Sequence, residues 1–259
     1  MGTGKSIYIM TDLEGISGID SMDMIQPGHP RYAYSLERLM ADTNAAVDGA
    51  FLGGAGRVLV CDGHGGGGNF RLDQLDPRAE IAAGPMRRQL DQGLDAVMFV
   101  GAHAMAGTWN GFLDHTQNSR QWFNYSVNGR RTGEIGQWGI MAGEFNLPVV
   151  MLSGDQAACT EARQFIGPLA CAVVKQGIGR NRAELVPESA AEQRIREAAA
   201  ASLALIHEIR PLRPLLPLEI RLELYRSDFC DEIAAREGVE RLDARTVRKI
   251  ATNYLDILF

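Results

Sequence analysis

The chain has 259 residues, a length that suits one large domain or two closely joined ones. Hydrophobic residues make up 46% of it and charged residues 22%, which is a globular rather than a disordered composition. The net charge of −6, without a cluster of lysines and arginines, argues against nucleic acid as a partner, and the apolar runs are too short for a membrane span.

The cysteines and the first residues bear on the cellular compartment. Cys61, Cys159, Cys171 and Cys230 are scattered, with no CxxC pair. Cys61 and Cys171 lie in apolar stretches typical of strands, which favours buried free thiols over disulfides. No hydrophobic signal segment is visible near the start. These observations predict a cytoplasmic protein.

Strands and helices alternate through the first part of the chain. Residues 7–11 are a short apolar run that predicts a strand, and residues 32–52 have apolar side chains at helical spacing, ended by Gly53 and Gly54. Residues 57–61 and 96–100 are continuous apolar runs, typical of buried parallel strands. A short helix is predicted between them, at residues 85–93.

The second part opens with a hairpin signal. Asn128-Gly129 stands between two strand-like runs, residues 122–127 and 130–133, and predicts a tight turn. Further elements are then predicted in this order: a helix at 133–146, a strand at 148–152, a loop and helix at 153–165, a strand at 171–175, an alanine-rich helix at 188–208, an alternating strand after the prolines that follow Arg210, and a helix at 244–259.

This alternation predicts an α/β fold with a mainly parallel sheet flanked by helices. The C-terminal residues differ in pattern and predict a smaller α+β portion. We therefore expect an α/β catalytic core at residues 1–200 and a C-terminal portion at residues 201–259 that packs on it.

Residues that can bind metals gather where the predicted strands end. In an open α/β sheet, ligands bind outside the carboxyl ends of the strands, and residues two apart on an extended chain point to the same side. Imidazole nitrogen and carboxylate oxygen without thiolate suit Zn²⁺, Mn²⁺ or Fe²⁺. The sequence predicts a metal site there, and the side chains concerned are Asp12, Glu14, Asp62, His64, His103, His115, Glu134 and Asp155.

A single aspartate or histidine at a strand end often has only a structural role. Aspartates cap helices and close turns, so Asp62 and Asp155 are left with either interpretation. His64 and His103 occur with carboxylates at equivalent strand ends, which favours a role in the metal site. His115 has only its neighbour Asp114 beside it, and the residues alone do not decide its role.

Charge bears on the number of metal ions. Asp12, Glu14 and Glu134 carry three negative charges, and without partners in a dry crevice they would repel one another and take up protons. Two divalent ions with a bridging hydroxide balance these charges. A single ion with fewer ligands is the alternative.

Five short motifs occur in a fixed order between residues 7 and 180: TDLEGISG, VLVCDGHGGGGN, GAHAMAGT, DHT and NGRRTGEIG. In this order they resemble the motifs of the M55 metallopeptidase family, the DppA-type D-aminopeptidases. The segments LPVVMLSGD and AVVKQGIGR match further parts of that family. No motif of the C-terminal residues adds to the resemblance.

The resemblance implies a dinuclear zinc centre. By position in the motifs, its ligands would be Asp12, shared by both metals, with Glu14, His64, His103 and Glu134, and its catalytic histidine would be His115 in DHT. Ring-shaped homo-oligomers are also implied. The expected function is a metal-dependent aminopeptidase that hydrolyses the N-terminal amide bond of small peptides, with D-amino acids expected, by a metal-activated water. Asp155 is a candidate for binding the free amino group.

Other functions are compatible with the same residues. One is a metal-dependent amidase that acts on a non-peptide amide. A phosphoesterase is another, but it needs cationic side chains near the metals, for which Lys175, Arg130 and Arg131 are the candidates. The third is a non-catalytic module around a structural metal, which would have no need of His115.

Overall fold

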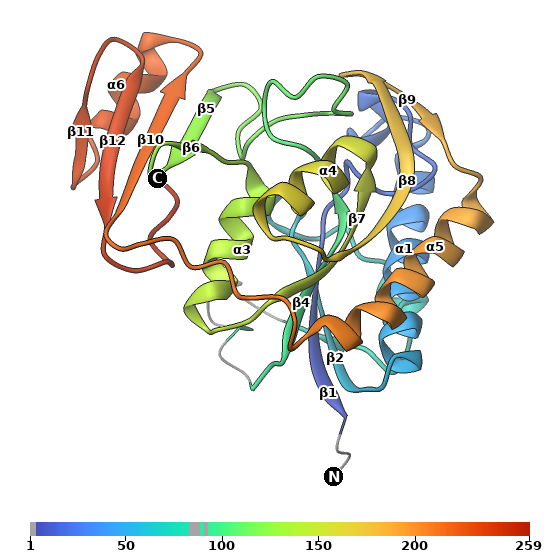
Figure 1. The fold of residues 1–259 in the computed structure, drawn as a ribbon. Coiled ribbons are helices and arrows are strands. Elements are labelled where there is room, and N and C mark those ends of the chain that lie inside the picture. Colours follow the sequence, from blue (N-terminus) through green and yellow to red (C-terminus); the bar gives the residue numbers. More distant parts are fainter. Residues whose placement is uncertain (1–3, 83–88, 91–92) are drawn as a thin grey trace.

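The structure of the protein is a computed structural model, which describes residues 4–82, 89–90 and 93–259. Within these residues, sheet A has seven strands in the order β3-β2-β1-β4-β7-β8-β9 (Figure 1). Neighbouring strands are parallel except β9, which is antiparallel to β8. The predicted parallel sheet is confirmed, and its strands are β1 (Lys5–Thr11), β2 (Ala55–Asp62), β3 (Glu80–Ile81), β4 (Ala96–Ala102), β7 (Val149–Asp155), β8 (Ala170–Gly179) and β9 (Arg182–Leu185).

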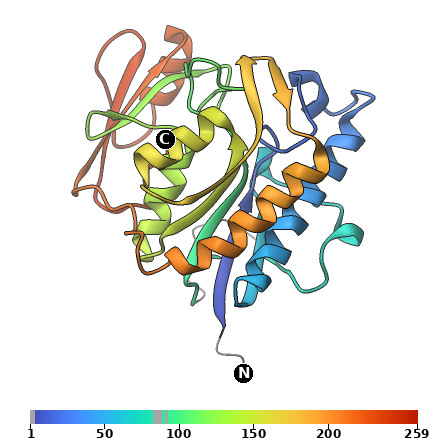
Figure 2. The same cartoon turned by 45° about the vertical axis from the view of Figure 1, so that its right-hand side comes forward.

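Helices cover both faces of sheet A. On one face α1 (Tyr32–Leu52) packs along α5 (Glu188–Ser202), and Figure 2 shows the two side by side. The other face carries α3 (Glu134–Glu144) and α4 (Gln156–Phe165) (Figure 1). The bounds of α1 agree with the predicted helix, because its apolar side chains follow the helical period and are buried at Leu36, Leu39, Met40 and Val47.

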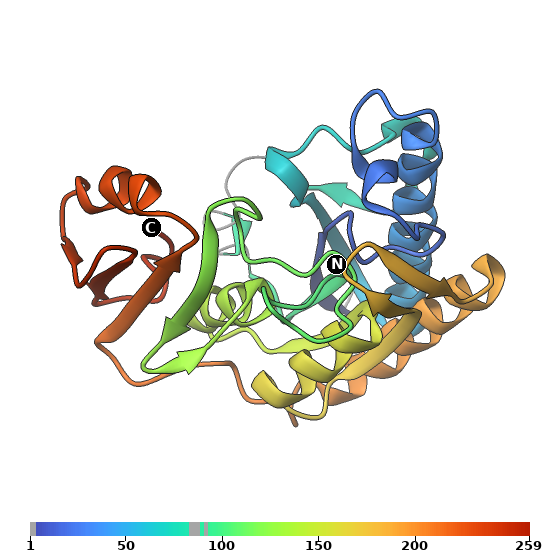
Figure 3. The same ribbon diagram turned by 90° about the horizontal axis from the view of Figure 1, so that it is seen from above.

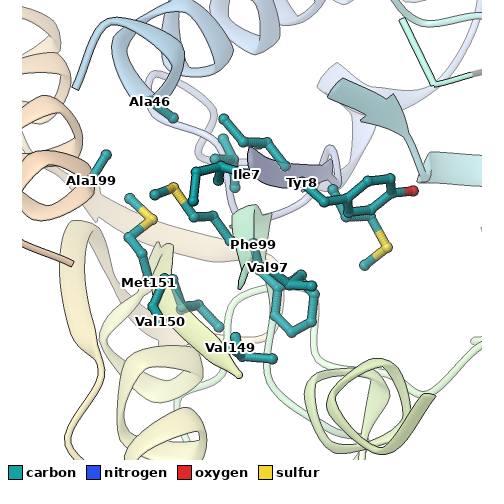
Figure 4. Packing of buried hydrophobic residues seen from close by; sticks show 14 of the residues in the cluster. Ile7, Tyr8, Ala46, Val97, Phe99, Val149, Val150, Met151 and Ala199 are labelled. Atoms are coloured by element: carbon teal, nitrogen blue, oxygen red, sulfur yellow. The ribbon is translucent and has the colours of Figure 1, made fainter. Parts of the chain in front are cut away.

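The main core follows from the two-residue period of the strands. Ile9 pairs with Met98, and both point to one face of sheet A. Tyr8 pairs with Val97, and both point to the opposite face. In Figure 4, Ile7 lies on the side of Ala46 from α1, while Tyr8 points away from it. All four cysteines are free, as predicted, although Cys171 is only partly buried.

A second sheet, the antiparallel sheet B, lies beside sheet A and its helices (Figure 3). In the described residues its order is β11-β12-β10-β5-β6. The Asn128-Gly129 hairpin is confirmed, with φ of 50° and 78° at these two residues. The elements are β5 (Trp122–Val127), β6 (Arg130–Arg131), β10 (Leu218–Leu224), β11 (Val239–Arg241) and β12 (Thr246–Ala251), with helix α6 (Ser227–Ala234).

Sheet B ties the middle of the chain to its end. β5 pairs with β10, in the register Ile220 opposite Val127. Helix α3 connects the two hydrophobic cores, because Ile135 packs into the core of sheet A and Ile140 packs into the core of sheet B. The predicted domain boundary at residue 200 stays a prediction. Sheet B combines β5 and β6, from before this residue, with β10, β11 and β12, from after it.

Two predicted helices differ from the structure. The helix predicted at residues 244–259 is wrong: this segment holds β12, whose Val247 and Ala251 are buried while it pairs with β10. Pairing with a distant strand overrides the local pattern there. The helix predicted at 188–208 ends at Ser202, and a 3₁₀ turn follows at Leu203–Leu205.

Other predicted elements differ from the structure by a few residues or lie outside its described part. The predicted helix at 85–93 lies mostly outside the described residues. Residues 153–155, predicted as loop, continue β7. Among the described helices, none is long and apolar enough to cross a membrane. Further 3₁₀ turns lie at Met22–Ile25, His64–Gly66 and Leu72–Gln74.

Candidate metal centre

The loop after β1 is held against the end of β4. The backbone N–H of Asp12 donates to the carbonyl of Val100 at 2.8 Å, and that of Gly15 donates to the carbonyl of Gly101 at 2.7 Å. These bonds fix the stretch that carries Asp12 and Glu14 beside the stretch that carries His103. Two neighbouring strands therefore deliver ligand-type side chains to one place.

This close approach requires glycine on both sides. A Cβ at Gly15 would lie 2.0 Å from the carbonyl oxygen of Ala102. A Cβ at Gly101, where φ is +77°, would lie 2.2 Å from the carbonyl oxygen of Asp12. Both obstacles are backbone atoms, which cannot move aside as a flexible side chain can. The two glycines thus set the spacing of the site.

His64 enters from the loop after β2. Its Nε2 lies 3.4 Å from Oε1 of Glu14. Asp62, two residues before it, accepts hydrogen bonds from the backbone N–H and from Nδ2 of Asn69, and so closes the loop that presents His64. Of the two interpretations left open for Asp62, the structure supports the turn residue.

His103 lies between two carboxylates. Its Nε2 is 3.3 Å from Oδ2 of Asp12 and 3.4 Å from Oε1 of Glu134. Its Nδ1 lies 3.0 Å from the carbonyl oxygen of Ala104. A carbonyl can only accept, so Nδ1 carries the hydrogen, and the lone pair of the neutral ring is on Nε2, facing the carboxylates.

Glu134 is the first residue of α3, directly after the β5–β6 hairpin. The backbone N–H of Gln117 donates to its Oε1 at 2.7 Å. A carboxylate in the first turn of a helix is also stabilised by the helix dipole. The hairpin turn and the helix start together place Glu134 opposite Asp12 and Glu14.

His115 stacks on His103, with ring centroids 4.0 Å apart and planes inclined by 10°. Its Nδ1 lies 2.8 Å from the carbonyl oxygen of Leu113 and therefore carries the hydrogen. Its Nε2 is 3.7 Å from Oε1 of Glu134 and 3.9 Å from Oε1 of Glu14. The structure thus brings all six predicted site residues together.

The electrostatics of the cluster show that it requires positive charge. Burial, and then the charge of Glu14, raise the pKa of Asp12 well above its usual range. Burial alone would lower the pKa of His103, but the Glu134 and Asp12 carboxylates raise it well above its ordinary value. Burial also opposes charge on His64, yet the hydrogen bond and charge of Glu14 raise its pKa to about 9. The carboxylates of the cluster thus favour positive charge beside them, from a protonated imidazole or from a metal cation.

His115 is the exception among the histidines. Burial and the neighbouring charge of His103 lower its pKa below the ordinary value. At neutral pH its ring is therefore uncharged, with the lone pair of Nε2 directed at the cluster. This is the state that a general base requires.

The residues fit divalent cations. Glu14 Oε2 is buried and has no hydrogen-bond partner within the described part of the chain, and a buried carboxylate oxygen is normally paired. Two overlapping triads each place one donor atom per residue within 4.8 Å of the others, Asp12-Glu14-His103 and His103-His115-Glu134. Oxygen and imidazole donors at such spacing suit zinc.

Two buried residues support the site, and the sequence alone did not assign these roles. Lys175 Nζ donates to the carbonyls of Glu14 and Ile19, at 3.0 and 2.9 Å. Glu161 Oε2 accepts from the N–H of Met105. In the sequence, the position of Lys175 within an apolar strand run is the one indication of its buried role. No sequence pattern indicates the role of Glu161.

Asp155 is engaged in the fold. Its Oδ1 accepts from the N–H of Ala158 and caps α4, and its Oδ2 accepts from the N–H of Phe112. Both carboxylate oxygens are thus occupied by backbone donors. This geometry argues against Asp155 as the group that binds a substrate amine.

A parallel sheet whose strand ends carry clustered carboxylates and imidazoles defines an α/β metal-dependent hydrolase. The chain belongs to the M55 peptidase family: the family model described as D-aminopeptidase matches residues 6–259. The resemblance drawn from the motifs is confirmed, and the chain is a metallo-aminopeptidase.

Two relatives are similar over most of the chain. A D-aminopeptidase of Bacillus subtilis (strain 168) is 30% identical over 224 residues, which cover 82% of this chain and 80% of that protein. A solved structure, described as Zn-dependent D-aminopeptidase DppA from Bacillus subtilis, a self-compartmentalizing protease, has a TM-score of 0.92. It is 26% identical, and the match covers 97% of this chain and 93% of the solved one.

Proposed function

We propose that this protein removes the N-terminal residue, expected to be a D-amino acid, from small peptides, with the help of two zinc ions. The proposed ligands are Asp12, Glu14, His64, His103 and Glu134, and the proposed acid–base residue is His115. The observation that carries the proposal is the cluster itself, in which one buried and two half-buried carboxylates face imidazoles and Glu14 Oε2 has no partner among the described residues. The description of the solved relative as zinc-dependent supports the choice of metal.

Two ions fit the cluster better than one. Beyond the triad of Asp12, Glu14 and His103, a further histidine, His64, lies beside Glu14, and a further carboxylate, Glu134, lies beside His103. The three carboxylates Asp12, Glu14 and Glu134 exceed the charge of one divalent ion by one unit. The excess negative charge, buried in this way, is costly unless a second cation balances it.

The residues of the chain divide the remaining work. Cations bound here would act as Lewis acids and lower the pKa of a water molecule toward neutrality. His115 is held by Leu113 O with its Nε2 free to accept a proton and to return it to the departing amine. Lys175 and the paired glycines Gly15 and Gly101 keep the carboxylates in place.

The phosphoesterase alternative is less favoured by the structure, because the three candidate cations have other partners. Lys175 bonds the carbonyls of Glu14 and Ile19. Arg130 donates to the carbonyl of Gln164, and Arg131 donates to that of Ala106. Phosphate recognition would need charges directed at the metals.

Elemental analysis and amino-acid release test the proposal together. We expect about two zinc ions per chain and release of amino acid from D-aminoacyl amides and peptides in preference to the L-forms. His115→Ala should keep the metal and lose at least about 100-fold in kcat, the usual contribution of a general acid–base group. The exposed His207, changed to alanine, is the matched control.

Three results would contradict the proposal. Absence of metal, with no activity after addition of Zn²⁺ or Mn²⁺, would exclude the dinuclear site. Unchanged turnover in His115→Ala would remove its assigned role. Metal retention without cleavage of any peptide or amide would favour the non-catalytic module.

We also propose that the chain works as a homo-oligomer. The solved relative is described as self-compartmentalizing, and such a protease places its sites in an enclosed space. Light scattering after size exclusion should give a mass several times the 28.3 kDa of one chain. A monomer at working concentration would contradict this.

A further inference from the structure

A cavity of about 280 Å³ opens at the metal cluster. Glu14, His64 and His115 line it at the cluster. Its volume is just below the range for ligand sites, which is roughly 300–1,000 Å³. The cavity therefore suits a short ligand rather than a long peptide.

Apolar side chains form another part of the wall, namely Met22, Ile25, Pro27 and Leu113. Such a surface accepts the aliphatic portion of an amino acid and excludes water from it. Charge is confined to the remaining wall. Apart from Glu14, which belongs to the cluster, the lining contains no acidic residue.

Two arginines, Arg120 and Arg180, line the cavity and differ in their partners. Arg180 Nε lies 3.6 Å from Oδ1 of Asp114 and donates to the carbonyl of Asp114 at 3.3 Å, so its charge is partly balanced. Arg120 is exposed, and its backbone N–H donates to Asn118 Oδ1. Within the described residues its guanidinium has neither an ion pair nor a hydrogen bond.

We propose that Arg120 binds the terminal carboxylate of the substrate, so that the site selects short peptides with a free C-terminus. This assignment rests on the proposed aminopeptidase function. In a short peptide the terminal carboxylate lies only a few bonds from the scissile amide, so both can occupy one small cavity. A guanidinium binds a carboxylate in a bidentate manner, and Arg120 lines the same cavity as the apolar side chains and the cluster.

The experiment compares matched substrates on matched variants. The substrates are one short peptide with a free carboxylate and the same peptide with a C-terminal amide. The variants are Arg120→Gln, Arg120→Lys, and Arg236→Gln as a control at an exposed arginine outside the cavity lining. Calorimetry with a reduced-amide analogue, as free acid and as carboxamide, measures binding without turnover.

We expect wild-type kcat/KM to favour the free acid by about tenfold or more, as one charge-assisted contact provides. Arg120→Gln should lose about tenfold on the free acid and less than twofold on the amide. Arg120→Lys should lie between, and Arg236→Gln should equal wild type. The analogue should show the same pattern in its Kd.

Equal losses on acid and amide, or no loss on either, would overturn the assignment and leave the aminopeptidase proposal standing. The opposite outcome, in which the proposed function fails and the Arg120 assignment holds, can be told apart from this one. If wild type binds the acid analogue about tenfold more tightly through Arg120 but cleaves neither peptide, the assignment holds and the proposed function fails.

Discussion

Glu14 and Gly15 show how closely the site depends on single residues. The side chain of Glu14 faces His64, its carbonyl accepts from Lys175, and the next residue tolerates no Cβ. Each of these constraints acts on the same short stretch of chain after β1. A small displacement there would separate the carboxylates from the histidines.

Gly15→Ala should therefore reduce metal binding. The added Cβ would meet backbone at 2.0 Å, and such overpacking typically costs about 1–3 kcal/mol or moves the backbone. We expect fewer metal ions per chain by elemental analysis, with a matching loss of activity. Gly179→Ala is the control, because a Cβ there meets nothing within 4 Å. Normal metal content in Gly15→Ala would show that the loop can shift without harm.

Glu161 gives a pH dependence to stability. Burial raises its pKa to about 7 from an ordinary 4.5. Between these values the folded chain holds a proton that the unfolded chain has released, so stability falls as the pH rises from about 4.5 to 7. The full effect is about 3 kcal/mol above pH 7.

Glu161→Gln keeps an oxygen for the N–H of Met105 and cannot ionise. Denaturant unfolding of metal-free protein should show the variant equal to wild type near pH 4.5 and more stable above pH 7. Metal-free protein is required because nearby cations would lower the pKa of Glu161. A constant difference across the pH range would contradict this account.

At the scale of residues, the sequence predicted the cluster and did not predict its supports. Strand-end position and two-residue spacing were sufficient to propose Glu14, His64 and His103. The contacts of Lys175, Glu161 and Arg120 depend on which loops meet in three dimensions, and no local pattern carries that information. His115 needed the family resemblance, because its closeness to His103 arises from a loop.

At the scale of elements, α4 depends on one aspartate. Asp155 caps the helix through Ala158 and also holds Phe112 N–H, and it is buried. Asp155→Ala should destabilise the fold by about 1–3 kcal/mol, through the lost cap and an unpaired buried N–H. Asp155→Asn, which keeps one acceptor oxygen, should lose less. Urea unfolding measures both.

The outcome also tests whether Asp155 binds the free amino group of the substrate. If Asp155→Ala raised KM greatly with no loss of stability, its carboxylate would have to be assigned to the substrate amine. A stability loss with KM unchanged in Asp155→Asn would confirm the structural role.

Several elements of the fold could be predicted because each has a strong local signal. Strand β1 and helix α1 have clear apolar periods, and Asn128-Gly129 marks its hairpin. Strand β12 has no such local signal, because its residues are also compatible with a helix. They form a strand only by pairing with β10. The short strands β3, β9 and β11 likewise depend on partners rather than on their own residues.

At the scale of the whole molecule, bound metal should stabilise the fold. Three carboxylates lie together in the folded state and are dispersed in the unfolded one, so cations favour folding. At a free metal concentration 100 times Kd, the gain is about 2.7 kcal/mol, or roughly 5–10 °C in Tm for a chain of this size. Calorimetry before and after chelation measures it. His103→Ala is the control, and its Tm should respond little to the chelator.

The pairing of β5 with β10 also has a consequence for biosynthesis. A ribosome makes Glu134 long before it makes Leu218–Leu224, the strand that completes the sheet behind the hairpin leading to Glu134. Until then the hairpin is two-stranded, which is marginal in water. A nascent chain released before Leu218 should therefore capture metal poorly, measurable with radioactive zinc. We therefore expect the site to become complete only near the end of translation, once Leu218–Leu224 has paired with β5.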